Sequence, residues 1–400
     1  MAAPAHLAPA CRFCGAQLDR VFANLGTTPL ANRNLRADEV AGEQRYPLIA
    51  RICGSCLLIQ VDDSVPAEAI FSNYDYFSST SSTWVAHAKR YCDGVRARFG
   101  ISSDSLVVEV GSNDGYLLQH FAAAGVPVLG VEPAANVAAL ANAQGMRTEV
   151  AFFGAATARR LVGQARKADL MVANNVLAHV SHIRDFVAGF AELLSERGVA
   201  TFEFPHVLNL IDQIQFDTIY HEHFSYLSLN AVERIMASAR LRVFDVEILP
   251  THGGSLRLFV CHDASDRVAT ANLGQLRARE RERGLDRLDG YSDLTGKIAA
   301  IRSAFLEFMA RAARERRVVA AYGAAAKGNT FLNVCGVTYP EVRAVYDKAS
   351  AKQGKLTPGS HIPILAPERI VQLEHNPIGL NRKRDGGDSQ RPTDRRVSSD

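Results

Sequence analysis

Several features that would place a chain in another class are scarce or missing in these 400 residues. Seven cysteines are too few for a secreted disulfide scaffold. No apolar run approaches the roughly 18 residues that span a bilayer, and the N-terminal MAAPAHLAPA lacks a basic segment followed by an apolar one. The 45 basic and 42 acidic residues are too balanced to give an electrostatic footprint for nucleic acid. We therefore expect a cytoplasmic monomer or weak homo-oligomer that binds neither membranes nor nucleic acid.

Short valine-rich runs alternate with helical patterns through the first two thirds of the chain. The expected strands are Ser105–Val110, Val128–Val131, Ala168–Val172 and Gly198–Phe204, and apolar residues at helical spacing predict a helix over Trp84–Phe99. Alternation of this kind is typical of a doubly wound parallel sheet. The sequence therefore predicts an α/β fold.

A second, smaller α/β unit follows an arginine- and glutamate-rich stretch. Residues 264–317 carry leucines at helical spacing and predict one or two long helices that bridge two units. Strands are then expected at Val318–Tyr322 and Val342–Tyr346, with GAAAKG as the turn between strand and helix. We accordingly divide the chain into residues 1–70, 71–245, 246–380 and a polar tail, 381–400, which we expect to be disordered.

Two CxxC pairs lie near the N-terminus. Cys11 and Cys14 are separated by 38 residues from Cys53 and Cys56, and four thiolates in two pairs suit tetrahedral zinc. Because four thiolates leave no open coordination position, we predict a structural Zn²⁺ in the 1–70 module. The alternative is a set of buried or redox-active cysteines without a metal.

The first strand ends in a glycine turn without the GxGxxG spacing of a dinucleotide fingerprint. It resembles the E/D-x-G-x-x-x-G turn of class I methyltransferases, which binds S-adenosylmethionine. An acidic residue ends the second strand, where it can accept hydrogen bonds from ribose hydroxyls, and two asparagines end the third. The predicted cofactor-binding residues are Glu109, Gly111, Asn113, Asp114, Gly115, Glu132, Asn174 and Asn175. A nicotinamide dehydrogenase is the competing interpretation.

A YHEH segment follows the fourth strand, where its loop reaches the same edge of the sheet as the glycine turn. The i, i+4 histidine spacing of a zincin is absent, which disfavours a catalytic metal. A histidine can remove a proton next to a carbonyl, a neighbouring glutamate can orient it, and Tyr220 could donate to the enolate. The alternative is a surface loop without chemistry.

Other polar groups lie in aromatic or glycine-rich segments. They include Tyr76 in NYDYFSS, His179 in NNVLAHV, and His252 and Arg257 in HGGSLR. Lys327, in GAAAKG, stands at a helix start where a phosphate can be held.

Taken together, these segments resemble the 3-C-methyltransferase family that acts on TDP-4-keto-deoxyhexoses in deoxysugar biosynthesis. The resemblance spans residues 11–370 and includes VVEVGSNDGYLL, YHEHFSYLS, THGGSLR and KQGKLTPGSHIPI. It implies a zinc module, a Rossmann-like methyltransferase domain and a second Rossmann-like domain that binds the nucleotide-sugar. It also implies that His223 is the base with Glu222 in support, and that Tyr220, Tyr76 and His179 bind the sugar or the enolate oxygen.

Two other functions stay open at this point. An NAD-dependent sugar-nucleotide oxidoreductase is disfavoured by the missing GxGxxG and by the lack of a Tyr-x-x-x-Lys pair. An inactive pseudoenzyme is favoured only by residues 371–400, which turn polar and arginine-rich where the family completes its last domain. The C-terminal unit is therefore expected to be truncated.

Lys327, His252 and Arg257 are the predicted substrate-binding residues.

Overall fold

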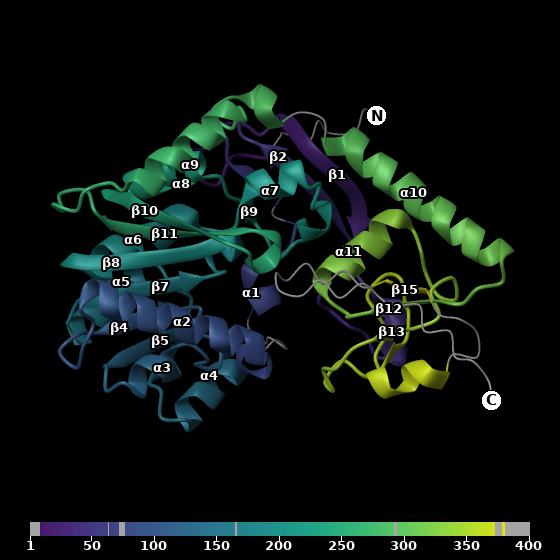
Figure 1. The fold of residues 1–400 in the computed structure, drawn as a ribbon, viewed down its shortest axis with the longest axis horizontal. Helices are drawn as coiled ribbons and strands as arrows, with labels where there is room; N and C mark the ends of the chain where they lie inside the picture. The colour runs from purple at the N-terminus through teal and green to yellow at the C-terminus, as the bar shows by residue number, and fades with distance from the viewer. Residues whose placement is uncertain are drawn as a thin grey trace, which may run out of the picture.

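The computed structural model describes residues 9–62, 64–71, 77–164, 166–291, 294–372 and 378–380. Three sheets organise these residues, and Figure 1 shows the N-terminal segment lying between a large sheet on one side and a smaller unit on the other. In this part of the chain, no helix combines the length and apolar character needed to cross a membrane. The tail expected to be disordered lies outside the described residues.

The central sheet has seven strands in the order β10-β11-β8-β7-β4-β5-β6. Its strands are β4 (Val107–Val110), β5 (Val128–Glu132), β6 (Thr148–Val150), β7 (Ala168–Asn174), β8 (Leu194–Pro205), β10 (Leu241–Leu249) and β11 (Ser255–His262). The four strands predicted from the sequence are present and pair in parallel. Within the described sheet β11 alone runs against its neighbours, so the predicted parallel sheet gains an antiparallel strand at this edge.

Helices cover both faces of this sheet, which explains why successive side chains of its central strands are buried on both faces. Val107 packs in one core with α2 and α3, whereas Val108 packs in the other with α5, α6 and α8. These helices are α2 (Ser82–Phe99), α3 (Leu118–Ala122), α5 (Ala155–Gln164), α6 (Ile183–Leu193) and α8 (Leu229–Ala237), with α4 (Ala135–Ala143) and α7 (Val207–Asp212) at the connections. The predicted helix over 84–99 starts two residues earlier, where Ser81 caps it, and ends at Gly100 with φ 68°.

Strands β10 and β11 form a hairpin that extends this sheet to His262. The predicted domain boundary at residue 245 therefore falls inside β10. The turn between the two strands uses Gly253 at φ 86° and Gly254 at φ 109°, backbone angles that favour glycine. Half of the HGGSLR segment is thus a turn, and the other half begins a strand.

The N-terminal module is a four-stranded antiparallel sheet, β1-β2-β3-β9. It contains β1 (Arg20–Thr28), β2 (Tyr46–Ile52) and β3 (Ile59–Val61), followed by α1 (Ala67–Phe71), and its last strand is β9 (Ser225–Tyr226) from the segment after YHEH. The other side of β1 packs against α10 and α11. The module therefore touches both α/β units.

The C-terminal unit is a parallel sheet in the order β14-β13-β12-β15. Helices α9 (Ala271–Glu282) and α10 (Leu294–Arg314) lead into it, as the arginine-rich stretch predicts. Its elements are β12 (Val319–Tyr322), α11 (Ala326–Cys335), β13 (Val345–Tyr346), β14 (Ile364–Leu365) and β15 (Ile378–Leu380). Strand, glycine turn and helix occur in the predicted order at residues 319–335.

A buried carboxylate joins α9 to the central domain. Glu280 accepts hydrogen bonds from the amides of Leu229 and Asn230 at the start of α8 and contacts His206 Nε2 at 2.6 Å. We expect Glu280→Ala to lower the free energy of unfolding by about 2–4 kcal/mol, because it leaves buried polar groups without a partner. Chemical denaturation measures this change. Glu282→Ala, an exposed change on the same helix, should have an effect below about 0.5 kcal/mol.

Candidate active site and metal centre

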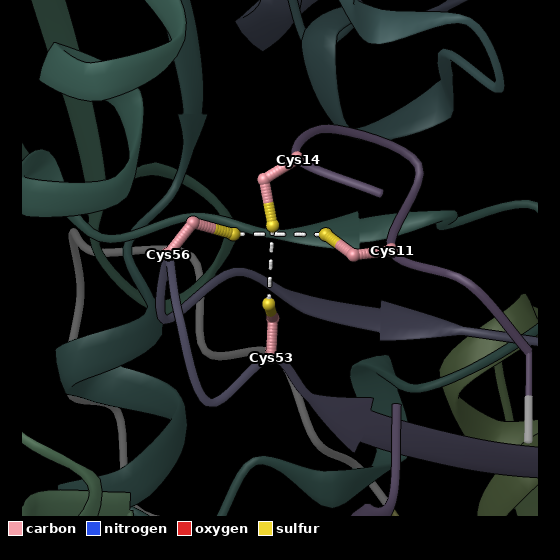
Figure 2. Close-up of side chains that lie close together, drawn as sticks. All are labelled: Cys11, Cys14, Cys53 and Cys56. Carbon is pink, nitrogen blue, oxygen red and sulfur yellow. Dashed lines mark hydrogen bonds between the residues drawn. The ribbon is translucent and has the colours of Figure 1, made fainter. Parts of the chain in front are cut away.

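The four paired cysteines converge on one point. Their sulfur atoms lie within 4.8 Å of one another, with Cys11 Sγ at 3.6 Å from Cys56 Sγ and Cys14 Sγ at 3.4 Å from Cys53 Sγ. Figure 2 shows the four side chains pointing inward from two knuckles. A tetrahedral zinc with bonds of about 2.3 Å places its sulfurs about 3.8 Å apart, so this cluster fits Zn²⁺.

One neighbouring amide group favours the thiolate form of Cys11. Gln60 Nε2 donates to Cys11 Sγ at 3.2 Å, and three of the four cysteines are buried. The spacings are far longer than the roughly 2.05 Å of a disulfide. The other cysteines, Cys92, Cys261 and Cys335, are buried in apolar cores.

The glycine turn after β4 requires glycine for two reasons. Gly111 has φ 67° and Gly115 has φ 81°, which L side chains rarely adopt. A Cβ at Gly111 would stand 2.5 Å from Val176 Cγ2, and one at Gly115 would stand 2.2 Å from Met146 Cε. The turn therefore packs closely against the chain on one side while its backbone faces a cavity on the other.

Glu132 holds this turn in place from the end of β5. Its carboxylate accepts hydrogen bonds from the amides of Asn113 and Ala134, both at 2.9 Å. Burial raises the pKa of Glu132, partly offset by these two amide donors. Each oxygen keeps a further lone pair for a ligand hydroxyl.

Two further acidic residues lie behind the turn. Asp114 accepts a hydrogen bond from the amide of Ser79 at 3.1 Å, and Glu109 is buried at the end of β4. Burial, with the nearby Glu132 and Asp114 charges, holds the pKa of Glu109 well above its usual range. Neither side chain lines the cavity, and because burial favours the neutral form of Glu109, the acidic group that contributes a negative field close to the turn is Asp114.

One large cavity, about 1210 Å³, opens at the carboxyl ends of β4, β5 and β7. Of the predicted site residues, those that line it are Gly111, Asn113, Glu132, Asn174, Asn175, His179, Tyr220, His223, His252 and Lys327. Among the described residues, Asn174 Oδ1 and Asn175 Nδ2 are buried there without a hydrogen-bond partner. Buried amides of this kind, beside a glycine turn and a carboxylate, fit a bound S-adenosylmethionine.

His223 lies in this cavity with its ring fixed at both nitrogens. Nδ1 donates to the carbonyl of Thr218 at 2.8 Å, so in the neutral ring Nε2 accepts from the Tyr220 hydroxyl, also at 2.8 Å. Burial, followed by the neighbouring His179, holds the pKa of His223 well below its usual range. The ring is therefore neutral near pH 7, with its basic nitrogen directed at a tyrosine hydroxyl.

His179 forms the second imidazole of the site. Its ring centroid is 4.7 Å from that of His223, and its Nδ1 donates to the carbonyl oxygen of Glu222 at 2.8 Å. Burial lowers the pKa of His179 to about 4. Tyr76, predicted to act beside it, lies outside the described residues.

The expected contact between Glu222 and His223 does not form. Thr218 holds the His223 ring instead, while the Glu222 carboxylate accepts from Asn32 Nδ2 at 2.6 Å. The side chain is 3% exposed, and burial raises its pKa to about 7. The other histidine of the triplet, His221, donates to the Pro47 carbonyl at 3.1 Å and does not line the cavity. One histidine of the pair therefore faces the site, as expected.

The three predicted substrate-binding residues separate in space. His252 and Lys327 line the cavity, and Lys327 Nζ donates to the His252 carbonyl across the two units at 3.3 Å. Arg257 is not brought to this cavity. It is buried on β11, where it pairs with Glu203 at 2.7 Å and Glu247 at 2.9 Å, an arrangement that sequence spacing does not reveal.

Several cavity residues were not predicted. Asn32, Trp84, Tyr116 and Lys352 all line it. Trp84 is the chain's single tryptophan and sits in the first turn of α2, stacked on His87 with centroids 4.9 Å apart. A lone tryptophan next to the SSTSST run was the signal available; Asn32 stood in no recognisable motif.

A glycine turn, an acidic residue at the next strand end and unpaired amides, all at the carboxyl edge of this sheet, define a class I S-adenosylmethionine-dependent methyltransferase. Family models match the whole organisation: a zinc binding domain at residues 11–71, a methyltransferase domain at 84–246 and a C-methyltransferase C-terminal domain at 250–377.

The chain belongs to the family of S-adenosylmethionine-dependent C-methyltransferases that carry this zinc-binding module. It is 34% identical over 363 residues to the C-methyltransferase NovU of Streptomyces niveus. The matched region covers 90% of this chain and 86% of NovU. Among solved structures, magnesium protoporphyrin IX methyltransferase (ChlM) from Synechocystis matches 44% of this chain and 83% of its own at 14% identity, with a TM-score of 0.36. The match to the PH0226 protein from Pyrococcus horikoshii covers 49% of this chain and 97% of PH0226 at 11% identity, with a TM-score of 0.39.

Removal of one thiolate should release the metal. We expect Cys53→Ala to lose stoichiometric zinc and to lower the thermal unfolding temperature, because metal binding contributes folding free energy to the module. Metal analysis and calorimetry measure both. Cys261→Ala, at a buried cysteine outside the cluster, should retain zinc; zinc retained by the Cys53 variant would contradict the assignment.

The buried imidazole of His179 should make stability fall in acid. Its pKa is lowered from 6.5 to about 4, so the unfolded chain binds more protons between these values, and stability is lost as pH falls through this window. We expect His179→Gln to reduce this loss by up to about 3 kcal/mol in denaturation at pH 7 and pH 4.5. The exposed His182, changed to Gln, serves as the control, and an identical pH dependence in the His179 variant would refute the prediction.

Proposed function

We propose that this chain transfers a methyl group from S-adenosylmethionine to carbon 3 of a nucleotide-linked 4-keto-deoxyhexose. The observation that carries the proposal is one continuous cavity lined by Gly111, Glu132, His223 and Lys327. A cofactor turn, a neutral base and a cationic helix start therefore share one reaction space.

Gly111, Asn113, Glu132, Asn174 and Asn175 would hold the cofactor, with the Glu132 carboxylate accepting from ribose hydroxyls. Asp114 places negative charge behind this wall, which favours a cation in front of it. When bound, the cofactor supplies an electrophilic methyl on a sulfonium that leaves as a neutral thioether.

His223 would act as the base. Its Nε2 takes the proton from carbon 3, the C–H bonding pair becomes the C3–C4 double bond, and the ketone π pair moves onto the oxygen at carbon 4. As His223 takes up the proton, the Tyr220 hydroxyl no longer donates to Nε2 and can turn to the enolate oxygen. His223 later returns its proton to solvent.

Lys327 and Lys352 would face the diphosphate. Both line the cavity on the C-terminal side, Lys327 in the first turn of α11, where backbone amides point outward. Asp347, just after β13, accepts from the Ala324 amide at 2.8 Å, the same relation that Glu132 has to Asn113. This repeated arrangement supports nucleotide binding by the second unit.

Replacing the base should stop turnover without removing the cofactor. For His223→Ala we expect kcat to fall by at least about 10²–10⁴-fold with TDP-4-keto-6-deoxyglucose, because proton removal loses its acceptor. Calorimetric titration should give the wild-type affinity for S-adenosylmethionine. Turnover near the wild-type rate would remove His223 as the base.

The reaction class has its own test on the wild-type protein. Titration should give heat with S-adenosylmethionine and none with NAD, and NMR of the product should locate the methyl at carbon 3. Methylation at carbon 5, which the 4-ketone also acidifies, would correct the position but keep the mechanism. Saturable NAD binding without S-adenosylmethionine binding would overturn the proposal.

A further inference from the structure

The loop that carries His223 is attached to the N-terminal module on both sides of that residue. Before it, the Glu222 carboxylate accepts from Asn32 Nδ2 at 2.6 Å. After it, the Phe224 carbonyl accepts from the Val61 amide at 3.1 Å, and β9 pairs with β3. Among the described residues, the hydrogen bonds of the His223 ring go to Tyr220 and Thr218 of the same loop, so the position of the ring depends on what holds its neighbours.

Arg12 connects the metal cluster to this loop. Arg12 lies between Cys11 and Cys14, donates to the Val61 carbonyl at 2.6 Å, and places its guanidinium 5.2 Å from the centre of the Phe224 ring. The cysteine knuckle, β3 and the residue next to His223 are therefore one packed unit.

A second connection runs through the Ala31–Asn32 segment, which meets all three parts of the molecule. Ala31 packs with Tyr220 from the YHEH segment and with Ala326 at the start of α11. Its carbonyl accepts from Asn329 Nδ2 of α11 at 2.8 Å. Asn32, next along, lines the cavity and holds Glu222.

We infer that Asn32 is a positioning residue, which acts through Glu222 to fix His223 against the cofactor turn. The N-terminal module is then part of the catalytic apparatus as well as a metal-stabilised domain. This inference rests on the proposed role of His223. The physical reason is that a hydrogen bond to a buried carboxyl group is strong, and small displacements of a catalytic group cost large factors in rate.

The test compares Asn32→Ala, Glu222→Ala, which removes the side-chain acceptor, and the double variant. With TDP-4-keto-6-deoxyglucose in D2O and no S-adenosylmethionine, NMR follows exchange of the carbon-3 proton, the step that His223 performs. We expect Asn32→Ala to slow exchange about 10–100-fold with KM changed less than about 2-fold. The double variant should be no slower than the slower single variant, because both changes break one connection.

Arg33→Ala, at the exposed neighbouring residue, is the matched control and should keep the wild-type rate. Asn32→Asp keeps the side-chain size but removes the amide donor, and it should behave like Asn32→Ala if the alanine variant folds poorly. Effects that multiply in the double variant would show that Asn32 acts independently of Glu222, and they would overturn the inference.

A second readout requires no substrate. Amide hydrogen exchange of the 218–227 segment in the full-length protein should be faster in both Asn32 variants and unchanged in Arg33→Ala. Unchanged protection in the Asn32 variants would overturn the inference whatever the substrate proves to be. Failure of wild-type turnover, with altered protection in these variants, would instead count against the proposed function alone.

Discussion

The pairing of the two-residue strand β9 with β3 is the constraint on which the site depends. Ile59 opposes Tyr226 and Gln60 opposes Ser225, so a strand of the cysteine module ends on the loop that carries His223. Because Gln60 also donates to Cys11 Sγ, the same residue serves the metal cluster and the pairing. The central sheet supplies the glycine turn, and the N-terminal module holds the His223 loop that faces this turn.

Charge is distributed unevenly across the cavity. The wall formed by β4 and β5 has Glu132 at its surface and Asp114 behind it, whereas the opposite wall presents Lys327 and Lys352. A cation is favoured on the first side and a diphosphate on the second. Between them the imidazoles of His179 and His223 are kept neutral by burial, which suits a base that must accept a proton. In the proposed function, this field would orient two ligands of opposite charge toward His223.

Local sequence was enough to predict the parts of the site that depend on local geometry. The cysteine spacing predicted a cluster, and the structure forms it. The segment VVEVGSNDG predicted a strand followed by a glycine turn, because the conformation of each depends on residues that are adjacent in the sequence. Glu132 and Asn174 were placed correctly at the cavity, since the ends of parallel strands meet at one edge.

Partner choice over long range could not be predicted. Glu222 seemed to belong to His223 because the two are adjacent, yet its carboxylate binds Asn32, 190 positions away. Arg257 seemed to be a ligand residue, yet it neutralises the buried Glu203 on a strand that sequence analysis did not recognise. Such pairings follow from how three units pack, which periodicity does not encode.

A crystal structure with S-adenosylhomocysteine and the TDP-linked keto-sugar would test the central claim most directly. We expect the homocysteine sulfur to face carbon 3, with His223 Nε2 within about 3.5 Å of the same carbon. The nucleotide should lie on the side of Lys327. A cofactor bound away from Gly111 and Glu132, or a sugar ring out of reach of His223, would contradict it.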